Sequence, residues 1–518
     1  MIMKIIIVTL LSLLSYAYAA KLLGIFPHSA NSHYTLGEKL MKGFAKAGHD
    51  VTIITPYPTK NKPKNVVWKD VFIEGLEQQH REIFKKTNLF EDSKRPSWKR
   101  MISYQQIMIH WVNVTLYHPE VRALMNSTNI KFDAVIMEQF FNDAHKYFAH
   151  HFHCPLILLS SLGPMPWISN IVGNPSPPSY IGHFFKNGDF SHENFFSRFW
   201  NLFDYISDDL VDRFYFKPLQ NQILQKAFPG APSIKEIEKL TAFVFLNSHP
   251  SLIEAVPLVP NVVEIGGYHI DPPEQLPKDI QEFLDNAQDG VVYFSMGSNL
   301  KSRDMSMERR QMFANVFGKL KEKVLWKFED EHVAGMPDNV LTKSWLPQKD
   351  ILAHPNVKLF ITHSGFLSTI EAVYNGVPVL AIPVFADQFT NAKNAVRGGY
   401  GLKLHFNDEN FTETLSALLE ELLDNPKYKK NAERNSQIFH NRPLKPMENA
   451  VYWLEFVLRT NGAQHLKVAG AQLPLYKYLL LDVLGCILAA TVIVICLMRA
   501  AFKKIFLFCN GSKKEKVN

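Results

Sequence analysis

The residues with the clearest chemical potential lie between positions 357 and 388. An apolar run from Val357 to Ile361 has the length and composition of a buried parallel strand, and His363, Ser364 and Gly365 follow it directly. We expect a helix to begin near Gly365. The start of a helix offers free backbone N–H groups and the positive end of a dipole, so this point suits the binding of a diphosphate.

Carboxylate and amide side chains follow in the same stretch. Glu371 falls on the second turn of the predicted helix, where its carboxylate can accept hydrogen bonds from vicinal hydroxyls such as those of a ribose. A second predicted strand, Val379 to Pro383, leads to Asp387 and Gln388, which are good partners for sugar hydroxyls. The segment therefore predicts a nucleotide-sugar site.

Two earlier motifs could complete such a site. The indole of Trp345 can stack on a flat base, and the amide of Gln348 can bond to the edge of that base. Gly297 and Ser298 follow a predicted strand, so their backbone and hydroxyl could contact phosphate oxygens. Taken alone, Trp345 could be a core residue and the Gly-Ser pair a plain turn. No P-loop, GxGxxG or HExxH motif is present, so the nucleotide is not held in the manner of an ATPase or a dehydrogenase.

His33 is the candidate general base. It is expected in the loop after the first strand, where a cleft opens in an α/β fold, and its imidazole titrates near neutral pH. Position alone would favour a histidine in a surface loop, and His28 is a nearby competitor.

From Trp345-Leu346-Pro347-Gln348 through Gln388, the chain resembles the UDP-glycosyltransferases of animals, most closely their insect branch. The resemblance extends over almost the whole chain, and a long ordered signature of this kind is far more specific than a short glycine motif. It implies that His363 contacts the diphosphate and Glu371 the ribose, and that Ser32-His33-Tyr34 matches the catalytic histidine motif of the family.

The resemblance also implies an activity and its limits. It implies inverting transfer of a hexose, glucose by preference, from a UDP-sugar to a hydroxyl of a small lipophilic acceptor, with a role in detoxification, no metal and no cofactor. Where the family has an Asp to orient the base, this chain has Glu138, and Asp143 stands close enough to be the partner instead. UDP-glucuronic acid is the alternative donor. Because of Glu138, Leu367 and Ser368, a non-catalytic lipophile-binding or chaperone-like protein of the same fold stays an alternative.

The pattern of strands and helices predicts an α/β protein. Two series of alternating strands and helices indicate two doubly wound, Rossmann-like domains facing across a cleft, an arrangement that the resemblance names GT-B. The predicted acceptor-binding domain covers residues 21–268 and the UDP-sugar-binding domain residues 269–472. The resemblance further implies that the last helix before the tail, about Glu448 to Leu458, crosses back onto the first domain.

A region between about Tyr180 and Phe228 is rich in aromatic residues. Their helical spacing fits either core packing or the apolar wall of an acceptor pocket. The aromatics are Phe184, Phe185, Phe195, Phe196, Phe199, Trp200, Phe203, Tyr205, Phe214 and Tyr215.

The two ends of the chain predict the cellular location of the protein. Residues 1–20 have the charge, apolar core and small-residue cleavage site of a secretory signal, and residues 478–498 are long and apolar enough to span a bilayer. A basic tail, residues 499–518, follows the span, and basic segments prefer the cytoplasmic side. We therefore expect a single-pass type I protein of the endoplasmic reticulum with a lumenal, glycosylated body; Asn113, Asn126 and Asn410 head lumenal acceptor motifs.

Composition excludes several other classes. Much of the net charge of +7 belongs to the basic tail, so the charge gives little support to nucleic-acid binding. Of the four cysteines only Cys154 precedes the predicted span, which excludes a disulfide framework in the body. The run His145 to Cys154 holds several histidines but no i, i+4 pair of histidines, so it does not predict a metal site. A homo-oligomer stays open.

Overall fold

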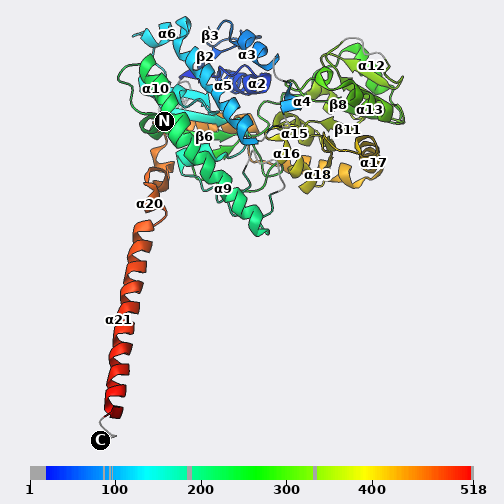
Figure 1. Cartoon of the computed structure of the whole chain (residues 1–518). Helices are drawn as coiled ribbons and strands as arrows, with labels where there is room; N and C mark the ends of the chain where they lie inside the picture. Colours follow the sequence, from blue (N-terminus) through cyan, green and yellow to red (C-terminus); the bar gives the residue numbers. More distant parts are fainter. Residues whose placement is uncertain are drawn as a thin grey trace, which may run out of the picture. The chain divides into compact units, whose positions relative to one another are not determined.

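The computed structural model describes residues 19–85, 88–92, 95, 97–183, 190–330 and 335–514 (Figure 1). The chain divides into two compact units, residues 1–467 and residues 468–518. The predicted signal segment lies outside the described residues except for Ala19 and Ala20.

The first half of the larger unit is built on a seven-stranded parallel sheet with strand order β3-β2-β1-β4-β5-β6-β7. The inner strands are continuous apolar runs, as expected for a sheet covered on both faces. Strands β3 and β7 were not expected, because β3 mixes charged with apolar residues and β7 is very short. The bounds are β1 Lys21–Ile25, β2 Asp50–Thr55, β3 Trp68–Phe72, β4 Ala134–Glu138, β5 Leu156–Ser160, β6 Thr241–Leu246 and β7 Val262–Glu264.

The second half is built on a six-stranded parallel sheet with strand order β10-β9-β8-β11-β12-β13. Five of its strands were expected from apolar runs, and the short β13 was not. The bounds are β8 Val291–Ser295, β9 Lys323–Lys327, β10 Val340–Lys343, β11 Val357–Thr362, β12 Val379–Ala381 and β13 Gly401–Lys403. Together the two sheets confirm the predicted fold class of two Rossmann-like domains.

Several helices contribute residues to the site. Five of them are α2 Asn31–Lys46, α3 Leu76–Lys85, α5 Ser97–Tyr117, α15 Phe366–Tyr374 and α16 Gln388–Arg397, and all of these except α5 come directly after a strand in the chain. The start of α15 agrees with the sequence prediction. Helix α2 begins earlier than expected, so His33 lies in the first turn of a helix and not in a loop. Ala30, in extended conformation, already caps that helix, and the polar residues after it continue the helix without a break.

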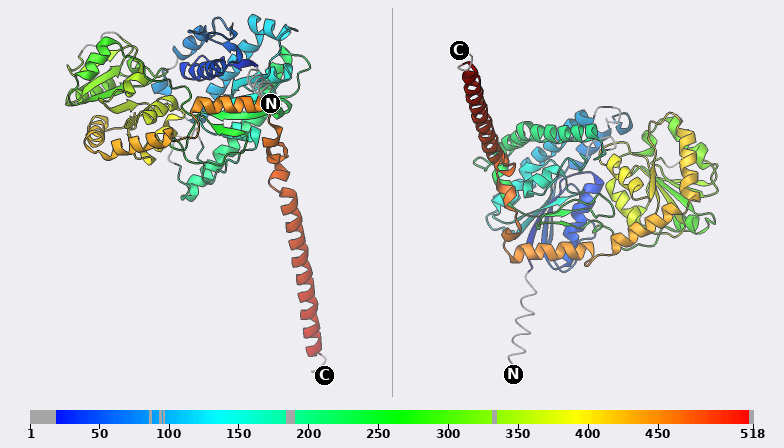
Figure 2. Two further views of the ribbon diagram at one scale, coloured as in Figure 1. Left: turned by 180° about the vertical axis from the view of Figure 1, so that it is seen from behind. Right: turned by 90° about the horizontal axis from the view of Figure 1, so that it is seen from below.

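Helix α19, Pro446–Arg459, returns from the second half to the first, as the resemblance implied (orange in Figure 2). Its buried residues Ala450, Leu454 and Val457 belong to the same apolar cluster as residues of β1 and α2. The ring of Trp453 stacks on Phe243 of β6 with centroids 4.9 Å apart. The first half therefore includes a helix that is encoded after the second half.

The aromatic region contradicts both interpretations of its spacing. Its helix α9, Phe195–Val211, and the following π-helical turn η2, Asp212–Phe216, leave most of these rings exposed. Tyr205 is half-buried, and Phe184 and Phe185 lie outside the described residues. The rings therefore form neither core nor, as shown below, a pocket wall.

The smaller unit contains α20, Leu475–Tyr478, and α21, Leu481–Lys514. Residues Leu481–Leu507 of α21 are long and apolar enough to cross a membrane. This candidate span begins three residues after the predicted one and ends later, because the helix continues through Arg499, Lys503 and Lys504.

Candidate active site

The functional side chains sit at the point in each sheet where the strand order reverses. In the first sheet this point lies between β1 and β4, and His33 follows β1 while Glu138 ends β4. In the second sheet it lies between β8 and β11, and Gly297 follows β8 while His363 follows β11. Ligands of doubly wound sheets bind at such points, beyond the carboxyl ends of the strands.

One cavity of about 680 Å³ is lined by residues from both halves. Of the predicted site residues, Glu138 and Ser364 are absent from its wall because both are buried behind it. The predicted residues that line it are His33, Gly297, Ser298, Trp345, Gln348, His363, Gly365, Glu371, Asp387 and Gln388. The structure thus brings together residues more than 350 positions apart, from His33 to Gln388.

His33 and Glu138 form a close pair. Nδ1 of His33 lies 2.5 Å from Oε1 of Glu138, whose side chain is almost fully buried. Burial lowers the pKa of His33, but the charge and hydrogen bond of Glu138 outweigh it, so the pKa is raised above its usual value. Nε2 of His33 makes no hydrogen bond within the described residues, and it is available to a ligand in the cavity.

His28 lacks the properties of a competing base. Its Nδ1 accepts a hydrogen bond from the backbone N–H of Ala30 at 3.0 Å, so Nε2 carries the proton and meets the Tyr104 hydroxyl at 3.1 Å. Burial, reinforced by His33 and His80, holds the pKa of His28 well below its usual value. Its ring stacks on that of His33 with centroids 4.1 Å apart. His28 is therefore an uncharged ring that stacks on the candidate base, His33.

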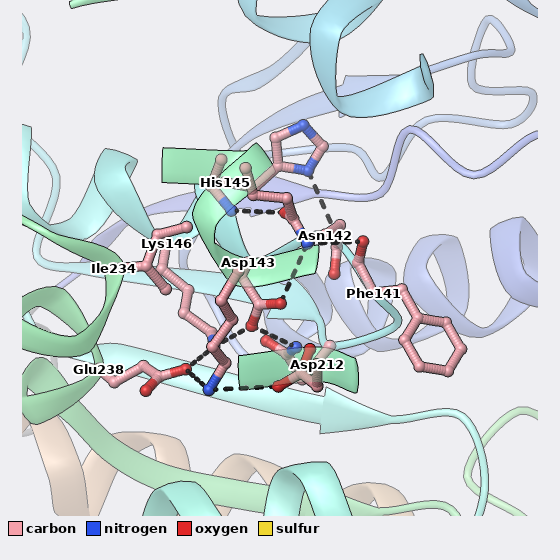
Figure 3. A network of polar contacts seen from close by, with 12 residues as sticks. Phe141, Asn142, Asp143, His145, Lys146, Asp212, Ile234 and Glu238 are labelled. Atoms are coloured by element: carbon pink, nitrogen blue, oxygen red, sulfur yellow. Dashed lines mark hydrogen bonds and ion pairs between the residues drawn. The ribbon is translucent and has the colours of Figure 1, made fainter. Parts of the chain in front are cut away.

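Asp143, the other candidate partner of His33, is committed elsewhere (Figure 3). Its carboxylate accepts hydrogen bonds from Lys146 at 2.5 Å, Gln139 at 3.0 Å and Gln220 at 3.2 Å. Lys146 has no exposed surface and also donates to Glu238 at 2.8 Å. Burial raises the pKa of Asp143, but the neighbouring lysines outweigh it and lower the pKa to about 2. The contact with His33 belongs to Glu138.

Two glycines enclose His363. A Cβ atom on Gly297 would come within 2.5 Å of the imidazole, and one on Gly365 within 2.4 Å, so only glycine fits at either place. Burial, together with the nearby charge of Lys327, lowers the pKa of His363 to about 3. His363 is thus a neutral hydrogen-bonding group at the start of α15. Ser364, with a left-handed φ of 62°, forms the turn and its carbonyl accepts from Asn391 at 2.9 Å.

Gln348 and Glu371 contact each other across the donor side of the cavity. The amide of Gln348 donates to Glu371 at 2.6 Å and to the Ser368 hydroxyl at 3.0 Å. Burial raises the pKa of Glu371 to about 7. Trp345 is 69% exposed and packs into no core, which leaves its face open to a base. Sequence reasoning expected Gln348 and Glu371 at separate parts of a ligand; in the structure they are one polar unit.

Asp387 and Gln388 open helix α16. Burial raises the pKa of Asp387 to about 6, while Asn391 donates to its carboxylate at 2.7 Å. The carbonyl of Gln388 accepts from the backbone N–H groups of Val384 and Phe385, so its NH₂ group stays available to a ligand. Both side chains line the cavity that also holds His33.

Part of the first-half wall of the cavity comes from residues that the sequence did not single out. Tyr104 lies on α5 and His80 on α3, and Phe140 packs its ring 4.8 Å from that of His33. Burial raises the pKa of Tyr104 above its usual value and lowers that of His80 to about 4. Neither α3 nor α5 follows a strand whose end marks the site, so no sequence motif identified them. Within the described part of the chain, no group of His, Cys, Asp or Glu could hold a metal ion.

Two facing parallel sheets with a shared cavity at their reversal points define the class as a GT-B glycosyltransferase. The kitacinnamycin glycotransferase has a similar structure, with a TM-score of 0.59 at 15% sequence identity, covering 86% of this chain and 99% of that one. The calicheamicin glycosyltransferase CalG4 is similar with a TM-score of 0.58 at 16% identity, covering 85% and 98%. At these identities the likeness concerns the fold.

The family follows from the sequence. The model of the family "UDP-glucoronosyl and UDP-glucosyl transferase" matches residues 20–516, and the chain belongs to that family. UDP-glycosyltransferase UGT5 of Dactylopius coccus is 37% identical, covering 94% of this chain and 92% of that protein. UDP-glucuronosyltransferase 2B15 of Rattus norvegicus is 33% identical, covering 74% and 72%. The chain is therefore a glycosyltransferase enzyme, and the non-catalytic alternative is set aside.

Proposed function

We propose that the protein transfers glucose from UDP-glucose to a hydroxyl of a small lipophilic acceptor, with inversion at the sugar carbon, and that His33 is the general base. The observation that carries this proposal is the His33–Glu138 contact of 2.5 Å at the wall of the shared cavity. Asp387 and Gln388 line the same cavity from the second half. A base and a sugar-binding pair on opposite walls leave room for an acceptor and a hexose between them.

The proposed step is a single displacement. Nε2 of His33 takes the proton of the acceptor hydroxyl as its oxygen bonds to the anomeric carbon. The bond from that carbon to the diphosphate oxygen breaks, and its electron pair leaves with UDP. Glu138 stabilises the imidazolium that forms, because its carboxylate already bonds Nδ1. His363 and the start of α15 donate hydrogen bonds to the negative charge that develops on the diphosphate.

The other residues that line the cavity are proposed to bind successive parts of the UDP-sugar. Trp345 stacks on uracil, while the Gln348–Glu371 unit binds the base edge and the ribose hydroxyls. Gly297 and Ser298 face the phosphates, and Asp387 and Gln388 bind the hexose. No cofactor or metal is assigned a role, since the UDP-sugar is a co-substrate.

Glucose is preferred over glucuronic acid because, among relatives that cover nearly the whole chain, the one named for glucosyl transfer is more similar in sequence. UDP-glucosyltransferase 2 of Dactylopius coccus is 35% identical, and the match covers 98% of this chain. UDP-glucuronosyltransferase 2B15 of Homo sapiens covers nearly as much of the chain, 94%, but at the lower identity of 29%. UDP-glucuronic acid is the second candidate donor.

For cellular placement, we propose a type I protein of the endoplasmic reticulum with a lumenal body. The candidate span Leu481–Leu507 and the basic residues after it support this orientation. Asn113 and Asn126 are exposed acceptors in the body. They should carry glycans, whereas Asn510 should not, and a glycan on Asn510 would overturn the orientation.

The central experiment is a product screen by mass spectrometry. The full chain is incubated with UDP-glucose, UDP-glucuronic acid or other UDP-sugars and a mixture of phenols, steroids and flavonoids. We expect glucosides, and their absence beside abundant glucuronides would reassign the donor. His33→Ala should lose roughly 10²–10⁴ in turnover, the usual effect of a positioned base, while UDP-glucose still binds. Full activity of His33→Ala with every acceptor would refute the mechanism.

A second variant separates sugar binding from nucleotide binding. Asp387→Ala should abolish transfer while UDP binds with nearly unchanged affinity, because UDP lacks the hexose that Asp387 is proposed to hold. Normal turnover would exclude Asp387 from the sugar site. Calorimetric titration with UDP and with UDP-glucose distinguishes these results.

A further inference from the structure

Helix α9 and the turn η2 expose mainly apolar side chains, whereas an ordinary surface helix exposes polar side chains and buries its apolar ones. Between residues 195 and 216 most of the exposed residues are apolar, and the exposed charged side chains include Asp208, Asp209 and Arg213, at 45%, 42% and 55%. We call the remaining exposed side chains the α9 face: Phe195, Phe196, Phe199, Trp200, Leu202, Phe203, Ile206, Leu210, Val211, Phe214 and Tyr215. A contiguous apolar patch of this kind marks a surface that is covered in the working protein.

One polar side chain of α9, that of Asn201, is fully buried and fixes the rotation of the helix. Asn201 has no exposed surface; its carbonyl accepts from the backbone N–H of His183 at 2.7 Å, and its amide donates to the Pro178 and Ile181 carbonyls. Asp208 pairs with the His183 ring at 2.8 Å. Turning the α9 face inward would break the buried hydrogen bonds of Asn201 and the pair of Asp208 with His183, so these contacts hold the apolar side of the helix outward.

The substrate cavity gives no reason for this face. None of the α9 face residues lines the cavity, which takes its apolar first-half wall from α3, α5 and the segment after β4. An acceptor in the cavity would therefore leave the α9 face uncovered. A separate occupant is required.

We propose that the α9 face lies in the interfacial layer of a neutral phospholipid bilayer. The inference rests on membrane insertion of Leu481–Leu507, the candidate span of the same chain. The connection of residues 468–480 can extend at most ~45 Å, so this bilayer is within reach of the larger unit in any arrangement of the two units. Phe, Trp and Leu on one side of a helix are the composition of helices that lie in a membrane interface.

Charge selects neutral lipid over anionic lipid. Residues 195–216 carry four aspartates, Asp204, Asp208, Asp209 and Asp212, against Arg198 and Arg213. Anionic headgroups attract basic segments, and this one is acidic. A second copy of the chain is the competing occupant, and the experiment separates it.

The test uses the full chain in discs of phosphatidylcholine, one copy per disc. Cys486, Cys496 and Cys509 are replaced by alanine, and Cys154 is buried. A single environment-sensitive fluorophore is placed by Phe199→Cys on the α9 face, or by Met307→Cys as a matched control. Met307 is 75% exposed and lies on α13, Met307–Phe317, in the second half. Thermal melting and UDP-glucose binding confirm that each labelled protein is folded.

Lipids with a nitroxide in the upper acyl chain should quench the label at position 199 at least threefold more than the label at 307. Soluble iodide should show the opposite order. Equal quenching by iodide at both positions, with no lipid effect, would overturn the proposal. Protection at position 199 that appears only with two copies per disc, without quenching by lipid, would replace the bilayer with a second copy.

A substitution on the face gives an independent result. Phe196→Asp with Phe203→Asp, combined with a label at Leu210→Cys, should remove the lipid quenching seen at Leu210→Cys alone. Both phenylalanines are more than half exposed, so the fold does not depend on them. Unchanged lipid quenching in this variant would mean that the face does not hold the helix in the bilayer.

Discussion

At the residue scale, neighbouring groups in the site have pKa values that are shifted in different directions, so that each favours a different protonation state. His33 is biased toward accepting a proton, while His28 and His363 are held neutral by burial. Glu371 and Asp387 have raised pKa values because they are buried with few donors until a ligand arrives. Groups with displaced pKa values concentrate where a reaction needs them.

The His33–Glu138 pair predicts a specific pH profile for kcat/KM. The base works only when unprotonated, so activity should fall as pH drops through the raised pKa of His33. Glu138→Gln removes the charge that raises this pKa, so the acid limb should move to lower pH while the plateau rate falls. Asp143→Asn should leave the acid limb in place, since Asp143 does not contact His33. A shift in Asp143→Asn and none in Glu138→Gln would make Asp143 the partner.

Glu371 predicts that donor binding depends on pH. Burial raises its pKa to about 7, and ribose hydroxyls donate best to the ionised carboxylate. The affinity for UDP-glucose should therefore weaken as pH falls below 7, approaching tenfold per pH unit for one linked proton. Calorimetric titration without acceptor measures it, because the diphosphate of UDP-glucose does not itself titrate there. Glu371→Gln should bind more weakly at pH 8 and lose the dependence between pH 8 and 7, above the pKa of about 6 of Asp387. A Gln variant that still depends on pH in this range would assign the proton elsewhere.

At the scale of elements, a buried ion cluster holds the segment that follows β4. Lys146 joins Asp143, next to the end of β4, to Glu238 in η3, Glu238–Leu240. Asn142 reaches back to donate to the Glu138 carbonyl at 2.9 Å, so the cluster also supports the backbone of the catalytic pair. The position of Glu138 thus depends on contacts several residues away.

Lys146→Met should be strongly destabilising. It removes the buried cation between Asp143 and Glu238 and leaves Lys217, 3.1 Å from Glu238, as the remaining one. Breaking a buried ion pair costs roughly 3–5 kcal/mol in comparable cases. The exposed pair of Lys321 and Asp424 is the matched control, and Lys321→Met should cost less than about 1 kcal/mol. Denaturant unfolding in a mild detergent measures both. Equal, small effects would show that the cluster contributes no more than a surface pair.

The sequence predicted the strands that are continuous apolar runs, and with them the side chains at the strand ends. His33 and Glu138 meet because β1 and β4 are neighbours, a fact that depends on strand order and not on either local sequence. Spacing alone could not tell that the rings of α9 face outward, because core and surface aromatics share the same period. His80 and Tyr104 were missed because their helices approach the cavity only through tertiary packing.

At the scale of the whole molecule, the return of α19 ties the two halves together. Leu454 of this helix has no exposed surface and packs in the core of the first half. Leu454→Ala should cost about 2–5 kcal/mol, the usual range for a buried leucine, and so lower the unfolding midpoint of the domain that holds His33. Tyr452, 45% exposed on the same helix, is the control, and Tyr452→Ala should change stability by less than about 0.5 kcal/mol. Identical midpoints for both variants would mean that α19 is dispensable for the first half.

The position of α19 in the chain also determines when the first half can complete its folding during synthesis. When residues up to β7 have left the ribosome, the first half still lacks the helix that covers Phe243 and the neighbouring apolar side chains. The second half, residues 278 to 440, must be synthesised before that helix exists. Part of the core of the first half therefore stays exposed while roughly 200 further residues are synthesised. Translation adds about 5–20 residues per second, so the exposure lasts longest when translation is slow. During that interval the nascent chain is a natural client for chaperones, and premature release anywhere before Pro446 yields a fragment that cannot close.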